Sequence, residues 1–275
     1  MDEYLADPAI QSGVLPFLIS GIWALATRRL GWAWAGLGFI FGFAALIHLT
    51  VGWQLDPLTS TRKFIIAVGA AAALGLLSDI FLRRAGVLNY VFALVGSAVA
   101  IWFVYPVLQR QEVVAWGMMA AGVAGYAAWL VWWTSYLSER DPLPATAALV
   151  ALGAGTGAAA LFGTTAFYGQ IGFSMAATCG ALALVALFTP NLGCGRSLFL
   201  AAGIAAALAG IAGVIYAKVP WYGLMPLLAV PALGHLPMPA RWPRWINGGV
   251  VFALCAACAA SAAYMTYRIE GAPPV

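Results

Sequence analysis

The sequence is poor in charge. Asp, Glu, Lys and Arg make up only 8% of its 275 residues, whereas a soluble domain carries about 25%. Such a chain lacks the polar surface that a water-facing globule needs, which excludes a soluble enzyme, a nucleic-acid-binding module and a disordered protein. The hydrophobic content of 64% and the mean hydropathy of +0.93 indicate that lipid is the main solvent. The composition therefore implies the lipid bilayer as a partner and no nucleic acid.

Cysteine and histidine are also scarce, at four and two residues. Four cysteines, three of them in apolar runs, do not indicate a disulfide framework, and neither histidine stands at a metal-ligand spacing. Cys255 and Cys258 share a helix face, which we interpret as small-residue packing. No motif for ATP hydrolysis, zinc proteolysis, serine hydrolysis or haem attachment occurs. We expect no enzyme activity, no cofactor and no metal.

Long apolar runs dominate what is present. A spanning helix needs about 20 apolar residues, and the chain divides into ten such segments. They cover residues 9–27, 32–53, 63–82, 87–108, 113–137, 144–163, 168–189, 196–217, 221–236 and 245–267. We therefore predict an all-α integral membrane protein, a polytopic bundle of about ten transmembrane helices that forms a single transmembrane domain over residues 1–275. A count of eight or nine spans is also possible, because the break near Gly163 is weak and Pro226 and Pro231 predict a broken or re-entrant ninth segment.

The basic residues predict the orientation. With the N-terminus outside, the loops on the cytoplasmic side hold Arg28, Arg29, Arg83, Arg84, Arg140, Arg196, Arg241 and Arg244. The other side holds Arg62, Lys63, Arg110, Lys218 and Arg268. Cytoplasmic loops carry an excess of Lys and Arg, so this division favours an N-terminus and a C-terminus that are both outside. We expect the protein in a bacterial cytoplasmic (inner) membrane.

An internal repeat is indicated by an offset of 134 residues. It places Asp7-Pro8 on Asp141-Pro142, Gly38 on Gly172 and Arg62 on Arg196. The repeats would be 1–137 and 138–275, each with five spans, and an odd number of spans inverts one copy relative to the other. Inverted repeats are common in secondary transporters. The competing interpretation is chance self-similarity of an alanine- and glycine-rich chain.

The five-plus-five plan with short loops is similar in outline to the drug/metabolite transporter superfamily. The similarity is one of length and helix count, and it carries no motif of that family. The usual orientation of the family, with the N-terminus inside, differs from the one that the basic residues predict here.

Asp79 is the strongest single candidate for chemistry. It is the only acidic residue that falls inside a predicted span, and ionisable groups in lipid mark functional sites by default. The functional hypothesis is a carboxylate that couples transport to a proton or cation. The alternative, which we favour, is an ion pair with Arg83 at the membrane surface, because residues four apart are neighbours on a helix.

The remaining candidates are polar residues near segment ends. His48 lies near the end of its segment and is followed on the same membrane face by Gln54 and Arg62. Tyr168, Gln170 and Arg196 stand near the starts of later segments. These residues could bind a substrate or a coupling ion, or could satisfy helix ends and nearby carbonyl groups.

Two functions follow from this sequence. One is a secondary transporter of a small solute, supported by the repeat, the short loops and the sparse buried charge. The other is a non-catalytic membrane subunit or assembly factor that packs against partner membrane proteins, supported by the shortage of buried polar groups. An intramembrane enzyme would need His, Asp or Glu clustered at one depth, and no such cluster is seen.

Overall fold

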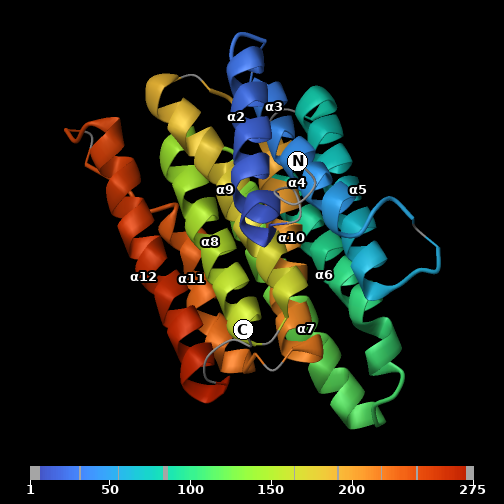
Figure 1. Ribbon diagram of the computed structural model, residues 1–275. Helices are drawn as coiled ribbons and strands as arrows, with labels where there is room; N and C mark the ends of the chain where they lie inside the picture. The colour runs from blue at the N-terminus through green and yellow to red at the C-terminus, as the bar shows by residue number, and fades with distance from the viewer. Residues whose placement is uncertain are drawn as a thin grey trace.

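A computed structural model describes residues 7–30, 32–54, 56–82, 86–163, 165–190, 192–217, 219–239 and 241–270. All regular secondary structure in these ranges is helical (Figure 1). The elements are η1 (Ile10–Val14), α2 (Leu15–Thr27), α3 (Trp32–Ala35), α4 (Leu37–Thr50), α5 (Ser60–Phe81), α6 (Val87–Leu108), α7 (Val113–Leu137), α8 (Pro142–Phe162), α9 (Ala166–Phe188), α10 (Gly195–Tyr216), η2 (Trp221–Leu224), α11 (Met225–Leu233) and α12 (Arg244–Glu270).

Eight helices in the described ranges are long and apolar enough to cross a membrane. They are the continuous η1–α2 helix, α5, α6, α7, α8, α9, α10 and α12. The second and ninth predicted segments correspond to shorter apolar helices, Leu37–Thr50 and Trp221–Leu233. The all-α membrane class is thus confirmed, whereas the count of ten spans stays a prediction.

The helix boundaries follow local sequence signals. The weak break near Gly163 is real, because α8 ends at Phe162 and α9 begins at Ala166. Asp141 caps the start of α8 by accepting a hydrogen bond from Leu143 N, and Pro142 occupies the first turn, where no amide hydrogen is needed. The ninth predicted segment begins as the 3-10 helix η2, which continues directly into α11, with Pro226 in the first turn of α11 and Pro231 inside it. A broken or re-entrant segment stays a prediction.

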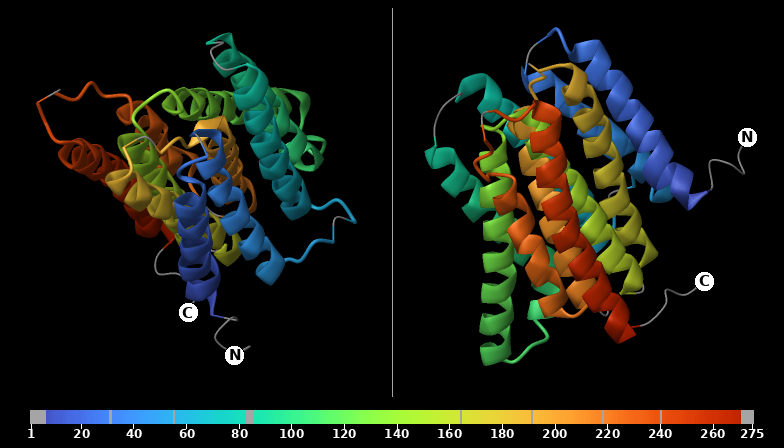
Figure 2. Two further views of the ribbon diagram at one scale, coloured as in Figure 1. Left: turned by 90° about the horizontal axis from the view of Figure 1, so that it is seen from above. Right: turned by 90° about the vertical axis from the view of Figure 1, so that its left-hand side faces the viewer.

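Helix α10 forms the centre of the bundle. Every residue from Gly195 to Gly213 is buried, and neighbouring helices surround it, α5, α7, α8 and α9 among them. After Arg196 and Ser197 in the first turn, its sequence is apolar on all sides, as expected of a helix with no polar environment to face. Figure 1 shows α12 at the left edge of the bundle and α5 toward the right, and in the view from above in Figure 2 α12 again lies at the left edge.

Small residues allow this close packing. A Cβ atom added to Gly203 would lie 2.1 Å from Thr134 Oγ1 in α7, and one added to Gly75 would lie 2.6 Å from the carbonyl oxygen of Arg196. Gly153 and Gly157 of α8 meet the backbone of α9 in the same way. Backbone contact through small residues is a usual basis for helix association in lipid.

The bundle has two chemically different ends. Helices α5, α7, α9 and α11 finish, and α6, α8, α10 and α12 begin, at one end, which we call the Asp79 end. The opposite end, where α4 finishes and α5 begins, is called the His48 end. Hydrogen bonds that connect α5 with α10, the α7–α8 loop with the segment after α11, and α8 with α12 show that these helix termini lie together.

Candidate functional site

Asp79 binds the first turn of the central helix. Its Oδ2 accepts a hydrogen bond of 2.7 Å from Arg196 N and one of 3.4 Å from Ser197 N. The side chain comes from α5, yet it does for α10 what an N-cap residue normally does within its own helix. The negative charge also lies at the positive end of the α10 dipole.

This position differs from the favoured prediction. Only 1% of Asp79 is exposed, so it is not an exposed ionic partner at the membrane surface. Its carboxylate is held by another helix, 117 residues away in the sequence. The predicted partner Arg83 lies outside the described residues. The sequence reveals an acid within a span, but the amide groups that bind it carry no sequence signature.

Arg196 extends the network from α10 toward the surface. It is 3% exposed, and its Nη1 donates a 3.0 Å hydrogen bond to the carbonyl oxygen of Leu82, at the end of α5. Its Nη2 lies 3.5 Å from Glu139 Oε1, on a side chain that is 43% exposed. Arg196 therefore satisfies a terminal carbonyl group of α5 and connects the buried end of α10 to a surface carboxylate.

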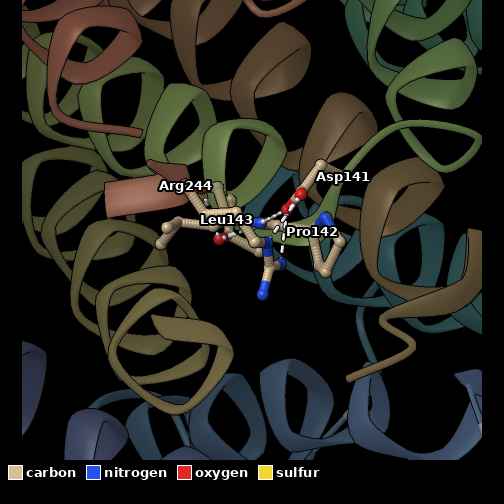
Figure 3. Close-up of polar contacts among 5 residues, drawn as sticks. Asp141, Pro142, Leu143 and Arg244 are labelled. Carbon is tan, nitrogen blue, oxygen red and sulfur yellow. Dashed lines mark hydrogen bonds and ion pairs between the residues drawn. The ribbon is translucent and has the colours of Figure 1, made fainter. Parts of the chain in front are cut away.

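A second ion pair joins α8 and α12 (Figure 3). Arg244 Nε lies 2.8 Å from Asp141 Oδ2, and Arg244 Nη2 lies 2.7 Å from Asp141 Oδ1. Burial alone would raise the pKa of Asp141, but the hydrogen bonds from Arg244 and Leu143 N, with the Arg244 charge, lower it below the usual value. Both carboxylate oxygens are thus occupied by donors.

His235 connects the segment after α11 to the C-terminal end of α7. Its Nδ1 accepts a hydrogen bond of 3.3 Å from Arg140 Nε, and its Nε2 lies 3.1 Å from the carbonyl oxygen of Trp133. The rings of Trp133 and Tyr136 have centroids 5.0 Å from that of His235. An Nδ1 acceptor requires the neutral ring, with the proton on Nε2.

A hollow of about 190 Å³ opens at the same end, beside the start of α10. Its lining includes Ser138, Arg140 and Cys194. Burial raises the pKa of the Cys194 thiol to about 12, so the thiol is protonated and a poor nucleophile. In the described part of the chain, no group of three or more His, Cys, Asp and Glu residues could hold a metal ion.

The candidate residues that the sequence grouped at the His48 end make separate contacts. His48 is exposed, and its Nδ1 accepts a hydrogen bond of 3.2 Å from Trp53 Nε1. Gln54 is exposed, and the Arg62 side chain donates to the carbonyl oxygen of Pro57. These contacts stay within the connection between α4 and α5 and its immediate flanks, and none joins two of the three candidates.

Tyr168 and Gln170 lie in the first turns of α9, at this same end. Tyr168 is buried, and its ring centroid lies 6.2 Å from that of Phe64. Its hydroxyl group forms a hydrogen bond with the Thr61 side chain. Gln170 is half-buried. Of the seven predicted site residues, the structure thus brings together Asp79 and Arg196 and leaves the other five at the opposite end.

Lys63 was missed as a candidate. It is 8% exposed, its Nζ donates a 2.9 Å hydrogen bond to the carbonyl oxygen of Trp102 in α6, and it lies 5.0 Å from the centroid of the Trp102 ring. Pro106 has no amide hydrogen, so the carbonyl group four residues earlier, that of Trp102, lacks its helical donor. Lys63 supplies that donor from α5.

No protein-family model matches the chain, and no curated protein matches it.

Proposed function

We propose that the chain is a secondary transporter of a small solute, without enzyme activity, in a bacterial cytoplasmic (inner) membrane. The supporting observation is the charged network of Asp79, Arg196 and Glu139, which ties α5, α10 and the α7–α8 loop together. Buried ionisable groups are expensive in lipid and usually serve substrate or ion movement. A network on the central helix is well placed to link ion binding to a change in helix packing.

Packing in the two halves supports the repeat on which this proposal draws. The offset of 134 residues pairs Gly38 with Gly172. A Cβ atom on Gly38 would lie 3.0 Å from Ser20 O in the preceding helix α2, and one on Gly172 would lie 2.4 Å from Gly157 Cα in the preceding helix α8. Both glycines therefore mark the contact between the first two segments of their own half. We propose two inverted halves, 1–137 and 138–275, with ten crossings in total.

Uptake into reconstituted vesicles tests transport without assuming a coupling ion. Vesicles with and without the protein would be incubated with mixtures of amino acids, sugars, nucleosides and small amines, under an imposed potential and pH gradient. Mass spectrometry of the vesicle contents should find at least one solute enriched only when the protein is present. Equal contents for all mixtures and gradients would refute the transporter proposal.

The orientation is part of the same proposal and has a separate test. The N-terminus is proposed to lie outside the cytoplasm, and ten crossings return the chain to its starting side. A reporter fused after Val275 should therefore be exposed outside the cytoplasm. A reporter that is active only in the cytoplasm would contradict either the orientation or the number of spans.

A second candidate function is favoured by the outer surface. A groove of about 290 Å³ runs between α8, α9 and α12, and small residues of α8 and α12 line it, including Ala154, Ala158, Ala256 and Ala260. Small residues permit close approach of another helix in lipid. The alternative is therefore a non-catalytic membrane subunit or assembly factor. Stoichiometric co-purification of one membrane protein, lost on Ala256→Leu, would favour that alternative.

A further inference from the structure

We infer that Asp79 is a proton-binding site that controls the first turn of α10. Its two carboxylate oxygens differ. Oδ2 accepts the amide hydrogens of Arg196 and Ser197, whereas Oδ1 is buried and has no hydrogen-bond partner in the described part of the chain. A buried carboxylate oxygen without a donor is costly, and a proton on that oxygen removes the charge. The role of Asp79 as the coupling site of a transporter rests on the proposed function.

The geometry selects a proton over a metal cation. Hard cations such as Ca²⁺ and Mg²⁺ require about six or more oxygen ligands, whereas a proton needs one lone pair. Oδ2 already faces two amide donors, whose partial positive charge repels a cation, so only Oδ1 is left. In the described residues no His, Cys, Asp or Glu cluster accompanies it.

The charges around Asp79 give protonation a structural consequence. On α10 the Arg196 guanidinium is directed to Leu82 O and Glu139, so it forms no hydrogen bond to the Asp79 carboxylate. Glu139, in the connection between α7 and α8, lies 3.5 Å from Arg196 Nη2 and so pairs with that cation. The thiol of Cys194 before α10 is neutral. The α10 amides are therefore the main partners of the ionised carboxylate, and protonation weakens their bonds.

Asp141 provides a matched comparison. Both aspartates cap a helix at the same end of the bundle, but both Asp141 oxygens accept hydrogen bonds, from Arg244 and Leu143 N. Asp141 therefore has no free oxygen and holds its charge. The inference concerns the free Oδ1 of Asp79, and the capping role alone does not imply it.

Infrared difference spectra of the protein in lipid nanodiscs, taken between pH 8 and pH 5, test proton binding directly. Acidification should produce the carbonyl stretch of a protonated carboxyl group. This band should vanish in Asp79→Asn, shift in Asp79→Glu and persist in Asp141→Asn and Glu139→Gln. The Asp79→Glu variant retains a titratable group if Asp79→Asn fails to fold. A band that is absent from the wild type, or unchanged in Asp79→Asn and Asp79→Glu, would overturn the inference.

Hydrogen exchange reports the consequence for α10. After correction for the intrinsic pH effect, exchange in a peptide containing Arg196 and Ser197 should speed up by about tenfold from pH 8 to pH 5, because a hydrogen bond to a neutral acceptor is weaker than one to a charged acceptor. Asp79→Asn should be fast at both pH values, and Na⁺ at constant pH should have no effect. Pronounced slowing by Na⁺ would contradict a proton site.

The two proposals fail separately. If Asp79 titrates but the protein moves no solute, the inferred proton site is kept and the transporter proposal is refuted. If the protein takes up a solute but Asp79 never titrates, the transporter proposal is kept and the inferred proton site is refuted.

Discussion

The Asp79 end and the His48 end use polar residues differently. At the Asp79 end, charged side chains contact distant parts of the chain: Asp79 binds α10 amides 117 and 118 residues away, and Arg140 binds His235, 95 residues away. At the His48 end, His48 and Arg62 each bind a group five residues away, within one connection. The long-range contacts of that end are made by the Lys63 ammonium group and by neutral hydroxyl groups.

This difference shows where polar groups influence the fold. A contact inside one loop fixes only that loop, whereas a contact between distant helices fixes their relative position. Charge in the described bundle is therefore structurally important chiefly at the Asp79 end, where a change in protonation could alter helix packing.

The largest effect is expected for Asp79→Ala. It leaves two amide groups of α10 without their acceptor, and unsatisfied buried donors cost about 1–3 kcal/mol each. We expect a loss of about 2–4 kcal/mol in unfolding free energy, measured by denaturant titration in mixed micelles. His48→Ala, at an exposed position, should cost less than about 0.5 kcal/mol. Equal losses would remove the distinction between the ends.

Gly75→Ala tests the packing behind Asp79. The new Cβ would lie 2.6 Å from Arg196 O and 2.7 Å from Ser197 Cα, so α5 and α10 must separate. Overpacking of this kind costs about 1–3 kcal/mol. Gly69→Ala in the same helix is the control, because no atom lies within 4 Å of its added Cβ. The control should be neutral or slightly stabilised, because alanine favours a helix more than glycine does. A melting temperature lowered equally in both variants would show that contact with α10 is not responsible.

Lys63→Met sharpens the comparison at the His48 end. It leaves Trp102 O without a donor, so we expect a loss of about 1–2 kcal/mol. In a Pro106→Ala background residue 106 regains its amide hydrogen, and the same substitution should cost less. The thermal stabilities of the two single variants and the double variant give this coupling. Additive losses would show that the proline does not create the need for Lys63.

The sequence predicts the helices better than the site. Apolar runs, the charged breaks between them and Asp141-Pro142 indicate nearly all the helix boundaries, because these signals are local. Asp79 could be identified as an acid inside a span, but the favoured interpretation places it at the membrane surface. Its actual partners are buried backbone amides of α10, which any sequence would provide. Glu139 has no feature that marks it as the partner of Arg196. Lys63 could have been inferred, since Pro106 within a helix implies a free carbonyl group at Trp102.

The smallest effect is expected for the exposed pair of Asp141 and Arg244. Exposed ion pairs contribute about 0.2–1 kcal/mol, and this pair is exposed, whereas the Asp79 contact at the same end is buried. The folded state lowers the pKa of Asp141, so the unfolded state binds a proton more readily. The pair should stabilise the fold above about pH 4, the usual range of an aspartate, and lose its contribution as the pH falls through the lowered pKa.

Asp141→Asn keeps a side chain that can cap α8 and removes the charge, and Arg244→Gln removes the other partner. Melting temperatures between pH 7 and pH 3 should show a slightly smaller acid-induced decrease in both variants than in the wild type. The double variant should match the single ones, because either substitution already breaks the pair. A loss at pH 7 as large as that of Asp79→Ala would mean that exposure does not distinguish the two aspartates.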